Sequence, residues 1–551
     1  MTDKNSFTLG IYGIQDINNS DTPILSHDHG VTVMQNGEIL FNIQLERLDR
    51  NKHSSAMPQM LYTLLKEKKL LDKNCNVVFV DNILGRSFIN NIGNIRFEAP
   101  ISKKIASNIE EGKLWWLNHS KKAFILNHEL AHLGSCLPFY GAFKENSLLV
   151  HFDGGASQSN FSAWIFKNGK IKNLEYHWRL KWLSSLFNAN ALTFGIVQAK
   201  QHELNSVPGK FMGFASFGKH SAEIELWLEK NQYFENIWGS KKVFFDALEL
   251  EFGVKLKFID QKNPLIQNIA ATIHHIFVRE AFNAIKRWQA KTKTDYLYYS
   301  GGAALNIVLN TKLVESKLFN EVFIPPCSND SGLAMGVAAF YEWQKNHIIE
   351  PHSPFLNNWG INNYTINYTD DTLKHIANLI INNKIVGVCN GFGEVGPRAL
   401  GNRSILSLAS SEKLAKKVSM EHKKREWYRP VAPIMLEKNT KYFTGLGGIN
   451  HLSKYMLLDF NIQENRIKEL EGAVHANGTA RIQTIFKRSD NPFIYDLLML
   501  LDTEFGVKAL INTSFNIKGE PIVHTLDNAR QSAQNMGLDA VVLNGKIEIL
   551  S

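Results

Sequence analysis

Apolar and polar residues alternate along parts of the chain in a pattern that predicts short β-strands. The expected strands cover 7–14, 30–34, 38–43, 147–152, 161–166 and 170–171. These six strands form two sets of three in chain order. In each set an Asn-Gly pair separates the last two strands, and such a pair is the strongest local signal for a hairpin. An acidic residue, Asp28 or Asp153, lies between the first two strands of each set. The repetition predicts a duplicated α/β lobe.

A second pattern points to a phosphate site in this lobe. A strand expected over 293–299 leads into Ser300-Gly301-Gly302-Ala-Ala-Leu-Asn306 and then into a helix. Unpaired amides and the helix dipole at such a junction attract phosphate groups. A duplicated lobe with a nucleotide cleft is the arrangement of actin-like (ASKHA) and sugar-kinase ATPases, which is an analogy of fold alone.

The composition changes after residue 346. Residues 347–364 are rich in proline, asparagine and other polar residues, which is typical of a connection between domains. Apolar residues spaced over 373–380 then predict an amphipathic helix that opens a second domain. We therefore predict two domains, residues 1–355 and residues 356–551.

The second domain contains a glycine-rich segment with two arginines, Arg398 and Arg403, directly after an apolar run. Glycines let the backbone approach a ligand, and guanidinium groups match phosphate or carboxylate oxygens. Further basic residues follow at Lys423, Lys424, Arg425, Arg429 and Arg481. The pattern favours an anion pocket, and the alternative is an ordinary basic surface.

His128-Glu129-Leu-Ala-His132 has the spacing that places two imidazoles on one face of a helix. One interpretation is a zinc metalloprotease with Glu129 as general base. The third histidine that follows His-Glu-x-x-His in many such proteases is absent. Asp153 and Asp330 are therefore better candidates for the remaining metal ligands. Two histidines with one or two carboxylates suit iron, manganese or zinc. The alternative is two surface histidines and two aspartates that cap helices.

Composition narrows the class of protein. The chain has 551 residues, of which 44% are hydrophobic and 21% charged, as in a globular protein with more than one core. The net charge of +9 suits anionic small substrates, and no long basic run predicts nucleic-acid binding. The four cysteines form no Cys-x-x-Cys pair, the chain begins with polar residues, and no apolar run reaches membrane-spanning length. We expect a soluble cytoplasmic protein with reduced thiols.

Several of these segments together resemble the O-carbamoyltransferase family of nodulation-factor, cephamycin and tobramycin biosynthesis. The resemblance runs nearly end to end. Its most specific pieces are Gly396-Pro-Arg-Ala-Leu-Gly-Asn-Arg-Ser404, Gly478-Thr-Ala-Arg-Ile-Gln483 and Asn512-Thr-Ser-Phe-Asn516; His27-Asp28, Gly209-Lys-Phe-Met-Gly213, the Ser300–Asn306 run and Lys423-Lys-Arg-Glu also match.

The resemblance implies an actin-like first domain, similar to the metal-binding ATPase that transfers threonylcarbamoyl groups to transfer RNA, and a second α/β domain of YrdC-like fold. The second domain would make carbamoyl adenylate from carbamoyl phosphate and ATP with Mg²⁺. The first would transfer the carbamoyl group to a hydroxyl of a small natural product, such as an antibiotic, or of a sugar. The family's metal is iron, so Fe(II) is the expected cofactor.

The resemblance also assigns residues by position. The adenylate-forming pocket matches Arg398, Lys423, Arg429, Arg481, Asn512 and Ser514. The metal ligands match His128, His132, Asp153 and Asp330, and His27 matches the histidine that takes the proton from the acceptor. Nucleotide phosphates would bind at Lys210, Ser300, Gly301, Gly302 and Asn306.

The chain also departs from the family's pattern. Many relatives have two adjacent histidines where this chain has Asn127-His128, and Gly155 stands where an acidic residue is usual. The loop over 15–26 is longer than typical and precedes His27, so it is expected to affect the acceptor site. Two alternatives to the carbamoyltransferase remain, the zinc metalloprotease and a non-catalytic nucleotide-binding relative, and a homodimer is left open.

Overall fold

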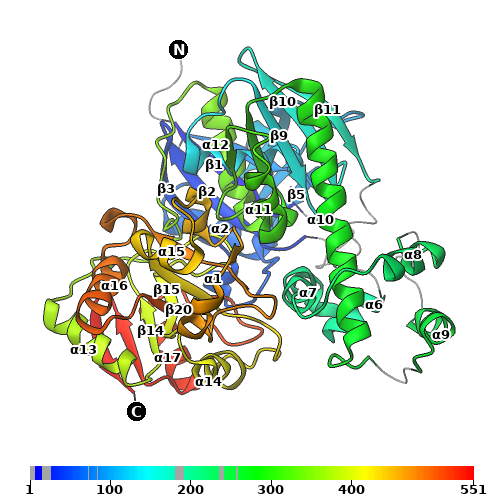
Figure 1. The fold of residues 1–551 in the computed structure, drawn as a ribbon. Coiled ribbons are helices and arrows are strands. Elements are labelled where there is room, and N and C mark those ends of the chain that lie inside the picture. Colours follow the sequence, from blue (N-terminus) through cyan, green and yellow to red (C-terminus); the bar gives the residue numbers. More distant parts are fainter. Residues whose placement is uncertain are drawn as a thin grey trace.

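The computed structural model describes residues 6–14, 26–71, 74–83, 85–179, 191–234, 241–255 and 259–550. We refer to the described residues up to 355 as the amino-terminal part and to those from 356 on as the carboxy-terminal part. Figure 1 shows the two parts packed side by side, with helices α6 to α9 gathered at one end of the long helix α10. None of the described helices has both the length and the apolar character needed to cross a bilayer.

The amino-terminal part contains two sheets with the same core arrangement. In the first, β1, β2 and β3 form an antiparallel meander, and β4 and β8 continue the sheet in parallel to β1. In the second, β9, β10 and β11 form the meander, and β12 and β13 are the parallel strands. The predicted repeat of strands is therefore present.

The strands of the first core are β1 (Phe7–Tyr12), β2 (Gly30–Gln35), β3 (Glu38–Gln44), β4 (Cys75–Val80) and β8 (His119–Leu126). Those of the second are β9 (Ser147–Phe152), β10 (Phe161–Lys167), β11 (Lys170–His177), β12 (Tyr296–Ser300) and β13 (Glu321–Phe323). The first sheet is extended by an antiparallel insertion that the sequence pattern did not predict, formed by β5 (Ser87–Ile89), β6 (Ile95–Glu98) and β7 (Glu110–Trp116).

Two helices pack between the sheets and position the functional residues. Helix α3 (His128–Gly134) packs against β9 and β12, and α12 (Leu333–Gln344) packs against β1, β2 and β4. The helices can cross closely because Gly336 has no side chain; a Cβ atom there would collide with the carbonyl of Ala131. The close crossing holds the histidines of α3 beside the segment that precedes α12.

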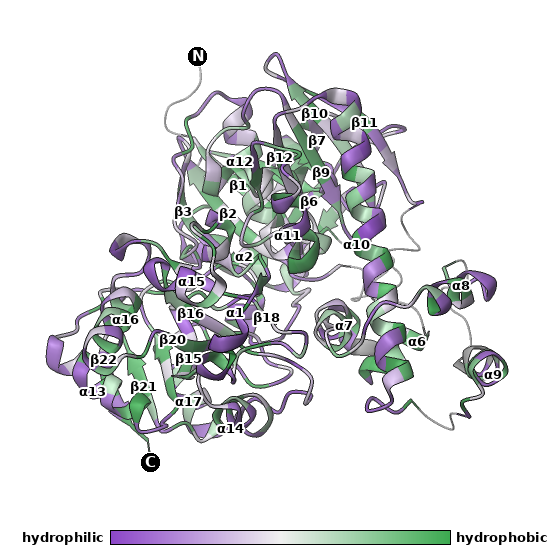
Figure 2. Cartoon of the chain, in the orientation of Figure 1, coloured by the Kyte–Doolittle hydropathy of each residue, from purple (hydrophilic) through white to green (hydrophobic). Residues whose placement is uncertain are grey.

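Other helices pack outside these sheets, and α6 to α9 gather at one end of α10 rather than on a sheet face (Figure 1). They are α2 (Met57–Glu67) on the first sheet, with α6 (Ala191–Val197), α7 (Val207–Ala215), α8 (Ala222–Lys230), α9 (Lys241–Phe252), α10 (Pro264–Thr292) and α11 (Ile307–Glu315) on the side of the second. Two short helices are α1 (Glu46–Asp49) and α4 (Leu137–Tyr140). Figure 2 shows apolar residues along the sheets and hydrophilic residues along much of α10, as expected for helices with one face in water.

The carboxy-terminal part is built on a seven-stranded mixed sheet of order β19-β16-β20-β15-β14-β21-β22. Adjacent residues of β15 face opposite sides, where Leu406 packs with α13 and α16, and Ile405 packs with α17. Because both faces are buried, the central strands β14 and β21 are apolar runs, whereas the edge strand β22 alternates.

The strands of this sheet are β14 (Val386–Cys389), β15 (Arg403–Leu408), β16 (Ala432–Leu436), β19 (Gln483–Ile485), β20 (Ala509–Ser514), β21 (Ala540–Leu543) and β22 (Lys546–Ile549). The helices are α13 (Asp370–Ile381), α14 (Glu412–Lys416), α15 (Glu437–Thr444), α16 (Pro492–Phe505) and α17 (Leu526–Met536), and β17 (Phe460–Asn461) pairs with β18 (Thr479–Ala480).

The connection between the two parts is itself packed. Trp359 is buried in the core of the first sheet, and Asn357 donates hydrogen bonds to the side chain of Gln44 and to the carbonyl of Glu394, at 3.1 and 2.9 Å. The residues after 355 therefore first follow the amino-terminal part before the second sheet begins.

Candidate active site between the two parts

A cavity of about 1460 Å³ lies between the amino-terminal and carboxy-terminal parts. Imidazoles, carboxylates and lysines such as Lys52 and Lys210 line it from the first part, and arginines and further lysines line it from the second. The two kinds of group form two clusters, which we call the imidazole–carboxylate cluster (His128, His132, Asp153 and Asp330) and the cationic cluster (Arg398, Lys423, Arg425, Arg429 and Arg481).

The imidazole–carboxylate cluster brings together the four residues predicted to be metal ligands. The Nε2 atoms of His128 and His132 are 3.1 Å apart. Asp330 Oδ1 lies 3.7 Å from His128 Nε2 and 3.5 Å from His132 Nε2. Asp153 Oδ2 lies 3.4 Å from His132 Nε2. The ligand-type atoms of His128, His132 and Asp330 therefore lie close enough to share one ion, and Asp153 approaches this group through His132, beside which His151 also lies.

These separations fit a metal ion. Ligand atoms that are each about 2.1 Å from an ion lie roughly 3–3.5 Å from one another. Burial raises the pKa of the Asp153 carboxyl, and the nearby Asp330 raises it further. A cation at the centre would remove this unfavourable pairing of carboxylates. Two imidazoles with two carboxylates suit iron, manganese or zinc.

Neighbouring groups fix the orientation of the two carboxylates. The Tyr12 hydroxyl donates a hydrogen bond of 2.8 Å to Asp330 Oδ2. The backbone amides of Gly154 and Gly302 donate to Asp153. Gly302 follows β12, so the turn predicted to bind phosphate also holds a carboxylate of this cluster.

Glu129 points away from the cluster. Its carboxylate is fully buried and accepts hydrogen bonds from Ser157 Oγ at 2.6 Å, from the amide of Gln158 at 2.8 Å and from Ser159 Oγ at 3.0 Å. A general base must reach a water molecule at the metal, and this glutamate instead holds the turn after Asp153. The geometry does not support the zinc metalloprotease.

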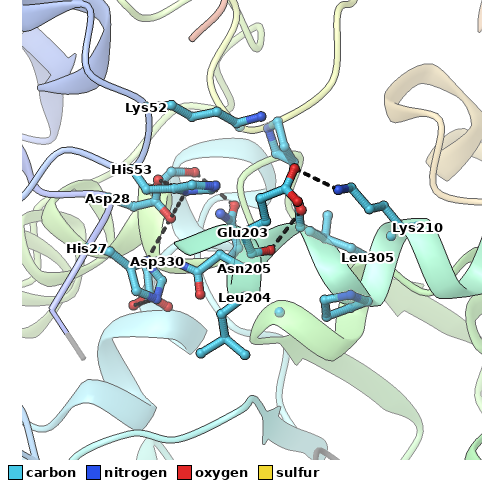
Figure 3. Close-up of a pocket in the computed structure, with 18 of the residues that line it drawn as sticks. His27, Asp28, Lys52, His53, Glu203, Leu204, Asn205, Lys210, Leu305 and Asp330 are labelled. Carbon is cyan, nitrogen blue, oxygen red and sulfur yellow. Dashed lines mark hydrogen bonds and ion pairs between the residues drawn. The ribbon is translucent and has the colours of Figure 1, made fainter. Parts of the chain in front are cut away.

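A third group of polar side chains adjoins the imidazole–carboxylate cluster (Figure 3). His27 Nδ1 lies 2.9 Å from Asp28 Oδ2, and His53 Nδ1 lies 3.0 Å from Asp28 Oδ1. His27 Nε2 faces Asp330 Oδ2 at 4.0 Å. Burial opposes the charged form, but Asp330 and Asp28 together raise the pKa of His27 to about 9. The predicted long loop over 15–26 lies, except for Ser26, outside the described residues.

The cationic cluster gathers positive charge with almost no compensation. Of its five members, only Arg429 forms an ion pair within the described part of the chain, with Glu426 at 3.5 Å. The Nε atoms of Arg398, Arg425 and Arg481 have no hydrogen-bond partner among the described residues. Burial and the neighbouring guanidinium groups lower the pKa of all three. This arrangement favours the binding of an anion.

The other residues predicted for the adenylate pocket lie around this cluster. The Lys423 ammonium donates to the carbonyl of Ser514, to the carbonyl of Asn516 at 2.6 Å and to Asn516 Oδ1 at 3.0 Å. Asn512 donates to the carbonyl of Ala399 at 3.1 Å. Asn512 and Ser514 line the cavity, so the structure brings the whole predicted set together.

The residues predicted to hold nucleotide phosphates are less uniform. Gly302 and Asn306 line the cavity, whereas Ser300 is fully buried and donates to the carbonyl of Ser328 at 3.2 Å. Gly301, with φ of 104°, packs against the backbone of Phe152. Lys210 lines the cavity, but its ammonium contacts Glu203 at 2.9 Å (Figure 3) and Glu426 at 3.0 Å.

Comparison with known proteins decides the family. A family model for the carbamoyltransferase N-terminus matches residues 22–339, and one for the carbamoyltransferase C-terminus matches residues 377–548. The chain belongs to the carbamoyltransferase family. The two matched ranges supply the two sides of the cavity, so the carbamoyltransferase assembles its candidate site from both.

Relatives of this carbamoyltransferase include two proteins with informative names. Nodulation protein NolNO of Sinorhizobium fredii is 24% identical, over 96% of this chain and 79% of that protein. The 3'-hydroxymethylcephem-O-carbamoyltransferase of Amycolatopsis lactamdurans is 28% identical, over 61% of this chain and 63% of that protein. A structure of full-length HypF in a phosphate- and nucleotide-bound form matches with 14% identity and a TM-score of 0.30, over 62% of this chain and 56% of that one.

The structure adds residues to the carbamoyltransferase site that the sequence did not single out for it. His53 contacts Asp28, and Lys52 extends into the cavity above His53 in Figure 3. His151 is fully buried beside His132, with ring centroids 5.2 Å apart. Asp28 was the motif residue that pointed toward His53, whereas Arg425 of the cationic cluster was already among the basic residues of the predicted anion pocket.

Arg403 has a different role from Arg398, although both lie in the glycine-rich segment. Its guanidinium is 1% exposed and donates to the carbonyls of Asn390, Gly391, Asn402 and His524 at distances of 2.8 to 3.1 Å. This arginine fastens the loop backbone and does not line the cavity.

Proposed function

We propose that the protein is an ATP- and carbamoyl-phosphate-dependent O-carbamoyltransferase. In this proposal a YrdC-like domain, residues 356–551, makes carbamoyl adenylate, and an actin-like domain, residues 1–355, transfers the carbamoyl group to a hydroxyl of a small natural product or sugar. The observation that carries the proposal is the opening of the uncompensated cationic cluster and the imidazole–carboxylate cluster into one cavity.

The cationic cluster provides for the donor half of the reaction. Carbamoyl phosphate and water give carbamate and phosphate, and a carbamate oxygen then attacks the α-phosphorus of ATP with loss of pyrophosphate. Each step places negative charge on phosphoryl oxygens. Arg398, Arg429 and Arg481 would neutralise that charge, and Lys423, Asn512 and Ser514 complete the pocket around them. Mg²⁺ would accompany the ATP.

The imidazole–carboxylate cluster and His27 provide for the acceptor half. The acceptor hydroxyl attacks the carbamoyl carbon and AMP leaves, while Nε2 of the neutral His27 ring takes the hydroxyl proton and Asp28 holds Nδ1. Because the charge of Asp330 raises the pKa of His27 to about 9, a cation held by Asp330 would favour that neutral form. A divalent ion would be held by His128, His132, Asp153 and Asp330. The family resemblance implies that this ion is Fe(II). When bound, such an ion supplies positive charge that stabilises oxygen anions. Gly302 and Asn306 would lie near the nucleotide.

Pyrophosphate release tests the donor half without knowledge of the acceptor. Purified protein with ATP, Mg²⁺ and carbamoyl phosphate is expected to release pyrophosphate, and Arg398→Gln is expected to lower the rate by roughly 100-fold or more. Arg488→Gln is the matched control, because Arg488 pairs with Asp496 at 2.7 Å on the surface. The proposal fails if the wild-type protein releases none, or if Arg398→Gln and Arg488→Gln behave alike.

A second experiment addresses the acceptor and the metal. Candidate hydroxyl compounds incubated with the complete reaction are analysed by mass spectrometry for the gain of one carbamoyl group. Elemental analysis of the purified protein identifies the ion. Substituting Asp330 with asparagine is expected to lower the metal content, and retention of a full metal complement would contradict the assigned ligand set.

A further inference from the structure

Helix α1 belongs to the amino-terminal part but contacts two loops of the carboxy-terminal part. Arg47 Nη2 donates to the carbonyl of Gly396 at 3.1 Å. Arg50 Nη1 and Nη2 donate to the carbonyls of Ile522 and Pro521, at 2.7 and 2.9 Å. A guanidinium group presents donors in a planar fork, so Arg50 can hold two successive carbonyls where a lysine could not.

The first of these loops carries Arg398. Gly396 precedes it by two residues and adopts a φ of 86°, and a Cβ atom there would collide with the carbonyl of Pro326. The adjacent amide of Val395 donates to the carbonyl of Pro354 at 2.8 Å. This loop therefore takes its position from the amino-terminal part, and Arg47, which is 2% exposed, is one of its fixed points.

The second loop covers 516–522 and begins beside Lys423. Asn516 accepts two hydrogen bonds from the Lys423 ammonium at the start of the loop. The amide of Val523 donates to the carbonyl of Phe515 at 3.0 Å and closes the base of the loop. Arg50 holds the returning limb, so a shift of that limb would be transmitted to the residues that orient Lys423.

The other side of α1 is fastened to the segment that carries His53. Glu46 accepts a hydrogen bond of 3.0 Å from the amide of His53, and Asp49 accepts one from the Ser54 hydroxyl. Arg50 and His53, with φ of 58° and 59°, each adopt the left-handed conformation that non-glycine residues rarely take. The helix is therefore anchored independently of the loops it holds.

We infer that Arg47 and Arg50 are positioning residues for the cationic cluster, so that the anion pocket of the carboxy-terminal part is completed by the amino-terminal part. The chemistry carried out there rests on the proposed function, but the binding of an anion does not. The inference is therefore tested with inorganic pyrophosphate, which requires neither turnover nor an acceptor.

The experiment uses the full chain with Arg50→Gln, Arg50→Lys and the control Arg96→Gln, which removes a surface arginine paired with Glu98. Titration calorimetry with pyrophosphate is expected to show a Kd roughly tenfold weaker for Arg50→Gln, a fraction of the ~100-fold that a misplacement of about 1 Å can cost. Arg50→Lys should also bind more weakly, because it keeps the charge but not the fork. Arg96→Gln should match the wild type. Hydrogen exchange of the amides in 515–523 should accelerate only in the Arg50 variants.

Each other outcome has a distinct meaning. Faster exchange in 515–523 with an unchanged Kd would show a contact that is only structural and would overturn the inference. A wild-type protein that binds no pyrophosphate would overturn it as well. If the wild type binds pyrophosphate and the Arg50 variants bind it more weakly, the inference stands, even if ATP and carbamoyl phosphate yield no product and the proposed function fails.

Discussion

Replacing Arg481 with methionine is expected to make the protein more stable and less able to bind phosphate groups. Arg481 lies in the cationic cluster, and its Nε atom has no hydrogen-bond partner among the described residues. Methionine keeps an apolar stem of similar length and removes the charge. The folded protein without a ligand then no longer has to hold this cation beside Arg429.

The size of the effect follows from the pKa of the guanidinium. Burial, and then the charge of Arg429, lower the pKa of Arg481 from 12.5 to about 10. At about 1.4 kcal/mol for each tenfold change, this corresponds to roughly 3 kcal/mol that folding loses while the group is charged. The loss is complete at neutral pH, below both values, and disappears only as the pH rises from about 10 toward 12.5.

Differential scanning fluorimetry measures the change in stability, and titration calorimetry measures the change in pyrophosphate binding. Arg481→Met is expected to raise the apparent Tm by at least about 2 °C and to weaken pyrophosphate binding by roughly 100-fold. Arg488→Met should leave the Tm close to that of the wild type, because it removes an exposed ion pair. A variant at position 481 that melts earlier than the wild type, or that binds pyrophosphate equally well, would refute the reasoning.

Three further substitutions test other parts of the site. Arg403→Met should lower the free energy of unfolding by roughly 3 kcal/mol or more, because it leaves several buried carbonyls without a donor; guanidinium denaturation measures this, and a loss below about 1 kcal/mol would contradict it. Glu129→Gln should weaken metal retention about tenfold on dialysis, since the turn after Asp153 loses its charged acceptor, whereas an effect on peptide hydrolysis would revive the metalloprotease. His27→Ala should release pyrophosphate at the wild-type rate but form no carbamoylated product, and loss of both steps would contradict a division between the two clusters.

Features set by short-range chemistry could be predicted from the sequence. Asn36-Gly37 and Asn168-Gly169 form the expected hairpin turns, and all four residues have the positive φ that Asn-Gly favours. Two imidazoles one helical turn apart face the same centre because helix geometry requires it. These features need no knowledge of how distant segments pack.

Other parts of the site depend on packing that a local pattern does not determine. Lys423, Lys424 and Arg425 are consecutive cations, which resemble a solvated run. A turn of π-helix over 417–422 precedes them, and Lys424 has a φ of 53°, so Lys423 and Arg425 turn inward while Lys424 stays exposed. Ser300 shows the reverse situation. Its glycine-rich context predicted a phosphate contact, whereas its hydroxyl lies in the core beneath the turn.

Gly396 sets how closely the carboxy-terminal part approaches the amino-terminal part beside the cavity. The missing side chain there lets one backbone rest directly on another, so even a methyl group would act as a wedge at the seam between the matched family regions. Such a wedge would lie two residues from Arg398 along the chain and would move apart the two walls of the cavity. The hydrogen atom that glycine has in place of a side chain therefore keeps the two walls of the cavity close together.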